Sequence, residues 1–301
     1  MATETNERLL VTGASGHLGR RVVDLLIEHG ARDVIAVTRT PEALGDVASR
    51  GVDVRRADFD DPSSLPAAFA GATRVLLVST SDIATPGRRL RQQRAAVTAA
   101  AEAGVRHIVY TSAPAPHPTP SDSLINDHFW TEAAIVATGL EWTILRNNLY
   151  TDFLLQGLPQ AVATGQLVTA AGTGRRGYVT RDDCATAAEA ALRSARGRQI
   201  LDVTGPDALT QAEVAALVGD LTGRSIDVVR LDGAALLARL KAAVPLPYAE
   251  ALVYFDMRAA EGHHAMVTSA VRDLTGRAPM SVPAFLKAHL TALTPTTTPG
   301  A

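Results

Sequence analysis

A glycine-rich run near the N-terminus has the residue types and spacing of a turn that binds a diphosphate. The run follows an apolar segment, Leu9–Thr12, and opens a segment with helical spacing, Leu18–Glu28. In such a turn the first glycine permits a tight reversal, the second lets the backbone approach a pyrophosphate, and the third allows close helix–strand packing. The N–H groups at the start of the helix bind the anion, so the alternative of a turn without a ligand is disfavoured by this context. The residues expected around the diphosphate are Gly13, Ser15, Gly16, His17, Leu18 and Gly19.

The residue after the second strand indicates which dinucleotide binds. An acidic side chain at this position would bind the ribose diol of NAD, whereas this chain has Thr38, Arg39 and Thr40. The planar guanidinium of Arg39 suits the 2′-phosphate of NADPH, and a solvated surface arginine is the alternative. Further cofactor-binding candidates stand at or after the ends of other strands: Asp58, Phe59, Ser79, Thr80 and Asn147.

Strands and helices alternate over the first 150 residues and are expected to bring these groups to one edge of a sheet. The predicted strands are Leu9–Thr12, Val34–Thr38, Val52–Arg56, Val75–Ser79, His107–Thr111 and Trp142–Leu145. The predicted helices between them are Leu18–Glu28, Glu42–Ser49, Ser63–Ala68, Arg88–Ala103 and Asp127–Thr138. Apolar strands without polar alternation belong to a sheet buried on both faces, and this alternation is typical of right-handed strand–helix–strand units. The sequence therefore predicts an α/β fold, a doubly wound parallel sheet of the Rossmann type.

The rhythm of strand and helix ends near Tyr150. We expect residues 1–150 to form an NADP-binding domain whose sheet is completed by later segments, residues 151–292 a smaller substrate-binding cap region, and residues 293–301 a disordered tail. A turn-rich stretch, Thr164–Gly177, opens the second half. Later helices are predicted at Arg181–Arg193, Leu209–Leu221 and Gly233–Ala243, and later strands at Gln199–Val203 and Ile226–Val229.

The composition narrows the classes of protein to consider. The net charge of −2 without a basic stripe argues against nucleic acid as a main partner. No apolar stretch approaches the length of a membrane span, and the first ten residues lack the features of a signal peptide. The single cysteine, Cys184, excludes an internal disulfide and favours a cytoplasmic location. The adjacent pair His263 and His264 does not lie on one helical face, so no metal site is expected. A homodimer is left open.

Several runs together resemble a known family. They are Leu10–Gly19, Ala57–Asp61, Tyr110–Ser112, Leu145–Phe153, Gly172–Gly174 and Thr180–Arg181. The chain is similar to the NmrA-like atypical short-chain dehydrogenases, and within them to bacterial NADPH:quinone reductases and triphenylmethane reductase. This resemblance, over about residues 8 to 235, implies NADPH as cofactor, a Rossmann domain with a small C-terminal cap, and aromatic or quinonoid acceptors.

The resemblance also frames the search for catalytic residues. Ordinary short-chain dehydrogenases use a Tyr-x-x-x-Lys pair, but the only lysines here are Lys241 and Lys287. Relatives place polar groups near the nicotinamide at the positions of Ser112 and His128. A histidine with a pKa near neutrality can donate a proton, and packing is the alternative for His128. Tyr110 is a third candidate, for which a core position is favoured by strand alternation.

Flat substrates would be bound by aromatic and loop residues. The candidates are His117, Trp130, Tyr150 and Phe153, and core packing is the alternative for each aromatic side chain. The main hypothesis is hydride transfer from NADPH to a quinone, a quinonoid dye or an aromatic, polyketide-like carbonyl. An NADP-sensing regulator without catalysis and a Rossmann enzyme with epimerase, lyase or cyclase chemistry are the alternatives, because the fold alone does not decide function.

Overall fold

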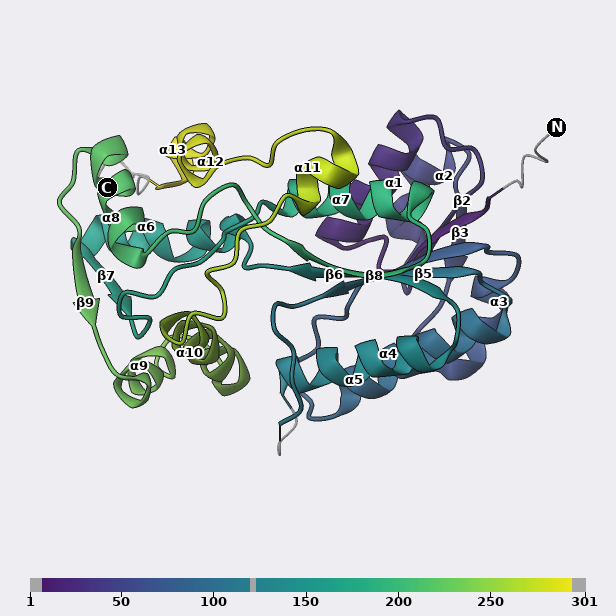
Figure 1. Ribbon diagram of the computed structural model, residues 1–301, viewed down its shortest axis with the longest axis horizontal. Helices are drawn as coiled ribbons and strands as arrows, with labels where there is room; N and C mark the ends of the chain where they lie inside the picture. The colour runs from purple at the N-terminus through teal and green to yellow at the C-terminus, as the bar shows by residue number, and fades with distance from the viewer. Residues whose placement is uncertain (1–6, 120–122, 294–301) are drawn as a thin grey trace, which may run out of the picture. The chain divides into compact units, whose positions relative to one another are not determined.

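The computed structural model describes residues 7–119 and 123–293, which fall into two compact units (Figure 1). The N-terminal unit comprises the chain up to Asn147 together with Cys184–Asp202 and Asp273–Gly276. The C-terminal unit comprises Asn148–Asp183, Val203–Arg272 and the chain from Arg277 onward. The N-terminal unit therefore includes segments that follow residue 150 in the sequence.

A seven-stranded sheet forms the centre of the N-terminal unit. Its spatial order is β3-β2-β1-β4-β5-β6-β8, and each neighbouring pair from β3 to β6 is parallel. The strands are β1 (Leu9–Val11), β2 (Val34–Thr38), β3 (Asp53–Arg56), β4 (Arg74–Leu77), β5 (His107–Ser112), β6 (Glu141–Asn147) and β8 (Arg198–Val203). The strand order reverses between β1 and β4, and such a switch point opens a ligand crevice at the carboxyl ends of the strands. This arrangement confirms the predicted Rossmann-type sheet.

Helices cover both faces of this sheet. In Figure 1, α1 (His17–Glu28), α2 (Gly45–Ala48) and α7 (Arg181–Ser194) lie over one face, and α3 (Leu65–Phe69), α4 (Arg88–Glu102) and α5 (Leu124–Ala137) lie over the other. Side chains of the strands, such as Leu10, Ile35 and Ile108, pack with Phe69 and Val97 in a fully or nearly fully buried core. Apolar strand residues are thus buried on both faces, as the sequence pattern predicts.

One buried arginine joins the late helix α7 to the sheet. Arg74, the first residue of β4, donates hydrogen bonds to the carbonyl oxygens of Ala191, Leu192 and Ala195. These carbonyls end a helix and would otherwise lack partners, so the guanidinium caps α7. Burial lowers the pKa of Arg74 to about 10.

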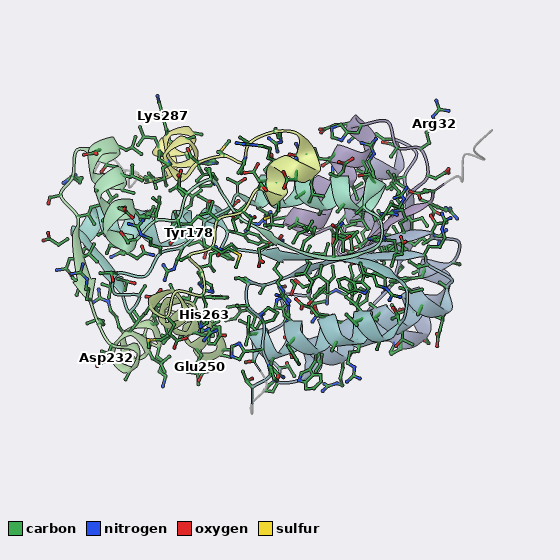
Figure 2. The ribbon with its side chains drawn as sticks, in the orientation of Figure 1. Arg32, Tyr178, Asp232, Glu250, His263 and Lys287 are labelled. Atoms are coloured by element: carbon green, nitrogen blue, oxygen red, sulfur yellow. The ribbon has the colours of Figure 1, made fainter. Side chains whose placement is uncertain are left out.

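The C-terminal unit has a small sheet of its own. Strands β7 (Gln166–Thr169) and β9 (Asp227–Arg230) pair in parallel. Its helices are α6 (Leu154–Thr164), α8 (Gln211–Thr222), α9 (Gly233–Leu240), α10 (Leu246–Ala260), α12 (Val282–Ala288) and α13 (Leu290–Leu293), while the short α11 (Ala270–Thr275) crosses the boundary between the units. Apolar residues of α6, α8, α12 and α13 form the core together with Tyr178, which lies inside this unit in Figure 2.

The second half of the chain contains elements that the sequence did not predict. The turn-rich stretch Thr164–Gly177 also includes β7, and five helices of this half were not predicted, α6 and α10–α13. Leu293, expected to begin the tail, ends α13 and is fully buried. The rest of the expected tail, residues 294–301, lies outside the described residues, as does Pro120. Within residues 7–119 and 123–293, no helix has both the length and the apolar character needed to cross a membrane.

Candidate cofactor site and active site

The glycine-rich turn lies between β1 and α1, at the switch point of the sheet. Gly16 is the N-cap of α1 and has no side chain with which to cap it. The Gly16 N–H binds the carbonyl of Gly13, and the first helical bond runs from the Arg20 N–H to the Gly16 carbonyl. The N–H groups of residues 17–19 thus have no acceptor in the helix, as at every helix start. Gly13, Ser15, Gly16 and His17 are exposed, which leaves the turn open to a ligand.

The backbone of the turn fits a dinucleotide diphosphate. Gly13 has a φ of +60°, which side-chain-bearing residues rarely adopt. A Cβ on Gly19 would lie 2.4 Å from the Gly13 carbonyl oxygen, so only glycine allows α1 to pack this closely. A Cβ on Gly16 would lie 3.3 Å from the same oxygen, and Gly16 itself is exposed. Leu18 is buried and anchors the first turn of the helix.

Arg39 follows β2 beside a cluster of hydroxyl groups. Ser15 and Thr38 share a hydrogen bond of 2.8 Å, and the Thr40 N–H donates to the Thr38 hydroxyl. Arg39 is exposed and forms no ion pair among the described residues, although its charge helps to lower the pKa of the nearby Asp60 carboxyl. An exposed arginine that stands between Thr38 and Thr40 in the sequence matches the requirements of a 2′-phosphate.

The expected adenine-flanking residues lie after β3. The Asp58 carboxylate accepts the N–H of Asp60, which closes a local turn, and Phe59 packs against the main core. Asp60 in turn binds Arg88 through two guanidinium nitrogens, and this contact holds the pKa of the Asp60 carboxyl below its usual range. The segment after β3 is therefore a charged turn, held by hydrogen bonds of Asp58 and Asp60.

Two threonine hydroxyls organise the chain after β4. Thr12 at the end of β1 accepts the Val78 N–H at 2.9 Å, and Thr111 on β5 accepts the Ser79 N–H at 2.9 Å. Thr111 also donates to the Ser79 hydroxyl. Within the described part of the chain, the buried hydroxyl of Thr80 has no hydrogen-bond partner. This unpartnered hydroxyl lies at the carboxyl edge of the sheet, where sheets of this type bind their ligands.

Tyr110 and His128 meet inside the layer between the sheet and α5. The His128 Nδ1 atom lies 2.8 Å from the Tyr110 hydroxyl, which donates to Gln93, and Nε2 lies 2.9 Å from an Arg89 nitrogen. Burial, together with the charge of Arg89, lowers the pKa of His128 well below its usual range. Burial likewise raises the pKa of Tyr110. His128 is therefore neutral at physiological pH, and this environment does not support the expected role as proton donor.

Ser112 lies two residues further along β5 and faces the next turn of α5. Its hydroxyl donates to Glu132 at 2.6 Å, and Arg146 on β6 forms a two-pronged ion pair with the same carboxylate. Ser112 and His128 thus both lie between β5 and α5, but they bind different side chains: Ser112 binds Glu132, and His128 contacts Tyr110 and Arg89. Asn147 ends β6 and is buried beside this layer.

The expected substrate residues of the N-terminal unit flank a loop. His117 is half-buried and its Nδ1 atom lies 3.2 Å from the Ala115 carbonyl oxygen. Trp130 is 45% exposed, and its indole N–H donates to Asn126, which also accepts the Thr119 N–H. Asn126 therefore joins the loop to Trp130, whose exposed ring is available for a flat ligand.

The other two expected substrate residues belong to the C-terminal unit. The rings of Tyr150 and Phe153 lie 5.7 Å apart, and the Arg181 guanidinium stands 5.3 Å from the centre of the Tyr150 ring. Phe153 is 46% exposed. Arg181 also binds Asp152, so the aromatic pair is held in place by a charged clamp.

Sequence reasoning missed the partners of the predicted residues. Arg89, Gln93 and Glu132 are buried and directly contact His128, Tyr110 and Ser112, respectively, and the half-buried Arg146 binds Glu132. One signal was available: an arginine, two glutamines and a glutamate lie on the buried faces of α4 and α5, where apolar residues are usual.

Comparisons with known proteins agree with this geometry. A family model for NAD(P)H-binding proteins matches residues 13–195. The (4-alkanoyl-5-oxo-2,5-dihydrofuran-3-yl)methyl phosphate reductase of Streptomyces griseus is 34% identical over 272 residues, which are 89% of this chain and 93% of that protein.

Two solved structures share the fold over nearly the whole chain. The NADPH-dependent quinone oxidoreductase of Escherichia coli, complexed with NADPH, gives a TM-score of 0.88 at 30% identity and covers 94% of this chain and 99% of that one. The triphenylmethane reductase of Citrobacter sp., complexed with NADP(H), gives a TM-score of 0.83 at 30% identity and covers 93% of this chain and 99% of that one. The chain is therefore a member of the NAD(P)H-binding family and an NAD(P)H-dependent oxidoreductase related to the quinone and dye reductases.

Proposed function

We propose that this protein transfers hydride from NADPH to quinones and quinonoid dyes, acceptors whose reduction needs no strong acid. The observation that carries the proposal is the state of the polar residues at the carboxyl end of β5. The Ser112 hydrogen is directed to Glu132, Tyr110 is fully buried, and His128 is neutral. The nearest lysine in the sequence is Lys241.

The chain's own groups would bind and orient the cofactor. Backbone N–H groups of the turn after β1 would hold the diphosphate, and Arg39 with the hydroxyls of Ser15 and Thr40 would hold the 2′-phosphate. Bound NADPH supplies the hydride. The segment Val78–Thr80, aligned by Thr12 and Thr111, would border the nicotinamide half.

The choice of acceptor follows from the missing acid. A simple ketone becomes an alkoxide on hydride transfer and needs a well-placed proton donor, which usually contributes about 10²–10⁴-fold to the rate. A quinone or a cationic dye forms a stabilised anion or a neutral product instead. Relatives named for quinone and triphenylmethane reduction support this assignment. Trp130 and His117 in the N-terminal unit are candidates for contact with such flat acceptors, and the Tyr150–Phe153 pair in the C-terminal unit is a separate candidate.

The test is NADPH consumption with a panel of acceptors at constant protein concentration. The panel contains a benzoquinone, a naphthoquinone, a cationic triphenylmethane dye, an aromatic polyketide-like ketone and an unactivated ketone. We expect turnover with the quinones and the dye, and little with the unactivated ketone. Turnover of the dye should not depend on protonation of His128 between about pH 6 and 8, because burial beside Arg89 keeps this ring neutral.

Three results would contradict the proposal. Fast reduction of the unactivated ketone without quinone turnover would show that the site contains an acid. Tight NADPH binding without turnover of any acceptor would favour a regulatory sensor. Conversion of a substrate without net NADPH consumption would favour epimerase or lyase chemistry.

A further inference from the structure

Arg89 is the largest fully buried side chain among the described residues, and it joins three elements. It stands in the first turn of α4. Its Nε atom donates to the Thr80 carbonyl at 2.6 Å, its Nη1 atom to the Leu124 carbonyl at 3.3 Å, and its Nη2 atom contacts His128 at 2.9 Å. A buried guanidinium is costly unless its donors are satisfied, so this placement requires a compensating role. Arg89 fixes the segment after β4 against the start of α5.

The contact with Arg89 determines which nitrogen of His128 carries the hydrogen. A guanidinium only donates, so the His128 Nε2 atom must accept. The hydrogen therefore resides on Nδ1 and is donated to the Tyr110 hydroxyl, whose own hydrogen goes to Gln93. The chain Arg89–His128–Tyr110–Gln93 has one direction of donation throughout. Protonation of His128 would place a second hydrogen against Arg89 and break the chain.

Thr80 links this buried chain to the cofactor edge of the sheet. Its carbonyl is held by Arg89, while its hydroxyl is buried and unpartnered within residues 7–119 and 123–293. The preceding N–H groups of Val78 and Ser79 are held by Thr12, which follows β1, and by Thr111 of β5. The Thr80 hydroxyl is therefore a side-chain group of this segment that has no partner among the described residues and is held in a fixed position through its own backbone.

We propose that Arg89 is a positioning residue, which presents the Thr80 hydroxyl to the nicotinamide half of the dinucleotide and holds His128 as the neutral Nδ1–H tautomer. The assignment of the nicotinamide half to this edge rests on the proposed function. Charged and titratable groups around His128 come from each packed element: Arg89 on α4, Tyr110 on β5, and Asp127 and Glu132 on α5. Arg89 is the only cation in this set, and its charge together with burial lowers the pKa of His128.

The experiment measures NADPH affinity by fluorescence titration and His128 protonation by NMR, and it requires no substrate. Thr80→Val replaces the hydroxyl by a methyl of similar shape and should weaken NADPH about fivefold, the equivalent of one hydrogen bond, with His128 titration unchanged. Arg89→Met should weaken NADPH at least as much, and it should raise the pH at which the His128 ring protonates. Arg89→Lys should restore most of the low protonation pH, because the charge is kept. His128→Asn identifies the resonance, and Arg91→Met, an exposed site on the same helix, is the matched control.

The outcomes separate this inference from the proposed function. Unchanged NADPH affinity in Thr80→Val overturns the role of the hydroxyl. Identical His128 titration in the parent and Arg89→Met overturns the role of the guanidinium. If Arg89→Met does not fold, the parent is compared with Arg89→Lys instead. A large rise in the pH at which His128 protonates in Arg89→Lys would then overturn the role of the charge. A protein that reduces no quinone yet shows the expected affinities and titrations loses only the proposed substrate class.

Discussion

The side chain of Arg39 is expected to determine the preference for NADPH over NADH. It is exposed after β2, forms no ion pair among the described residues, and follows Thr38, whose hydroxyl is hydrogen-bonded to Ser15. We predict that Arg39→Asp weakens NADPH binding by about 1–3 kcal/mol, the contribution of a charge-assisted hydrogen bond, because a carboxylate repels the 2′-phosphate. NADH, which lacks this phosphate, should lose little affinity. Fluorescence titration with both nucleotides measures the difference.

A matched control exists at the other end of the same strand. Arg32 precedes β2, is exposed and projects into solvent (Figure 2). Arg32→Asp makes the same change in charge at the amino edge of the sheet, away from the glycine-rich turn. It should leave both affinities unchanged. Equal losses for NADPH and NADH in Arg39→Asp, or equal effects of the two substitutions, would remove Arg39 from the cofactor site.

Two glycines of the turn between β1 and α1 are expected to affect different properties, stability for Gly19 and NADPH binding for Gly16. A Cβ at position 19 would lie 2.4 Å from the Gly13 carbonyl oxygen, so Gly19→Ala should force α1 away from the strand and cost about 1–3 kcal/mol of stability. Gly16→Val adds atoms on the open side of the turn and should abolish NADPH binding with little change in melting temperature. Thermal unfolding and NADPH titration of both variants measure the two effects independently.

A third glycine gives the baseline for these substitutions. Gly45 in α2 has a helical φ of −58°, and a Cβ there would meet no atom within 4 Å. Gly45→Ala should change stability by at most about 0.5–1 kcal/mol, toward greater stability, and leave NADPH affinity unchanged. Normal NADPH binding by Gly16→Val would show that the diphosphate does not lie on this turn.

The sequence predicted the elements of the first 150 residues well because their patterns are local. β2 begins and ends where the apolar run does, and the glycine turn signals its own position. The second half lacks such signals. α6 contains Gly157 and Pro159, which argue against a helix, and only Ala249 and Ala259 of α10 are fully buried, so its periodicity is weak.

The candidate site likewise has features that local sequence patterns predict and features that they do not. Positions such as Ser112 and His128 follow from strand ends and from a family resemblance, but their protonation depends on partners distant in sequence. His128 is 39 residues from Arg89, and Ser112 is 20 residues from Glu132. Whether a histidine is an acid or a neutral acceptor is set by these long-range contacts, which no local pattern encodes.

At the scale of the whole molecule, buried histidines make the fold sensitive to acid. His107 in the N-terminal unit is fully buried, and burial together with the charge of Arg74 lowers its pKa to about 4. His264 in the C-terminal unit is also buried, and burial with Arg176 nearby lowers its pKa to about 4. In the unfolded chain both should titrate at the ordinary value of 6.5. Between these pH values the unfolded state binds more protons than the folded state, so stability rises with pH.

We therefore predict that the free energy of unfolding is constant above about pH 7 and falls by roughly 1.4 kcal/mol per pH unit for each of these histidines below about pH 6. Urea midpoints measured at several pH values between about 4.5 and 8 test the slope. His107→Gln keeps a hydrogen-bonding group opposite Thr143 but cannot be protonated, so it should flatten the curve by one histidine's share. His17→Gln, at an exposed position, should leave the slope unchanged. A parent curve that is flat down to about pH 5, or a His107→Gln curve as steep as the parent's, would mean that burial of His107 does not govern the acid sensitivity.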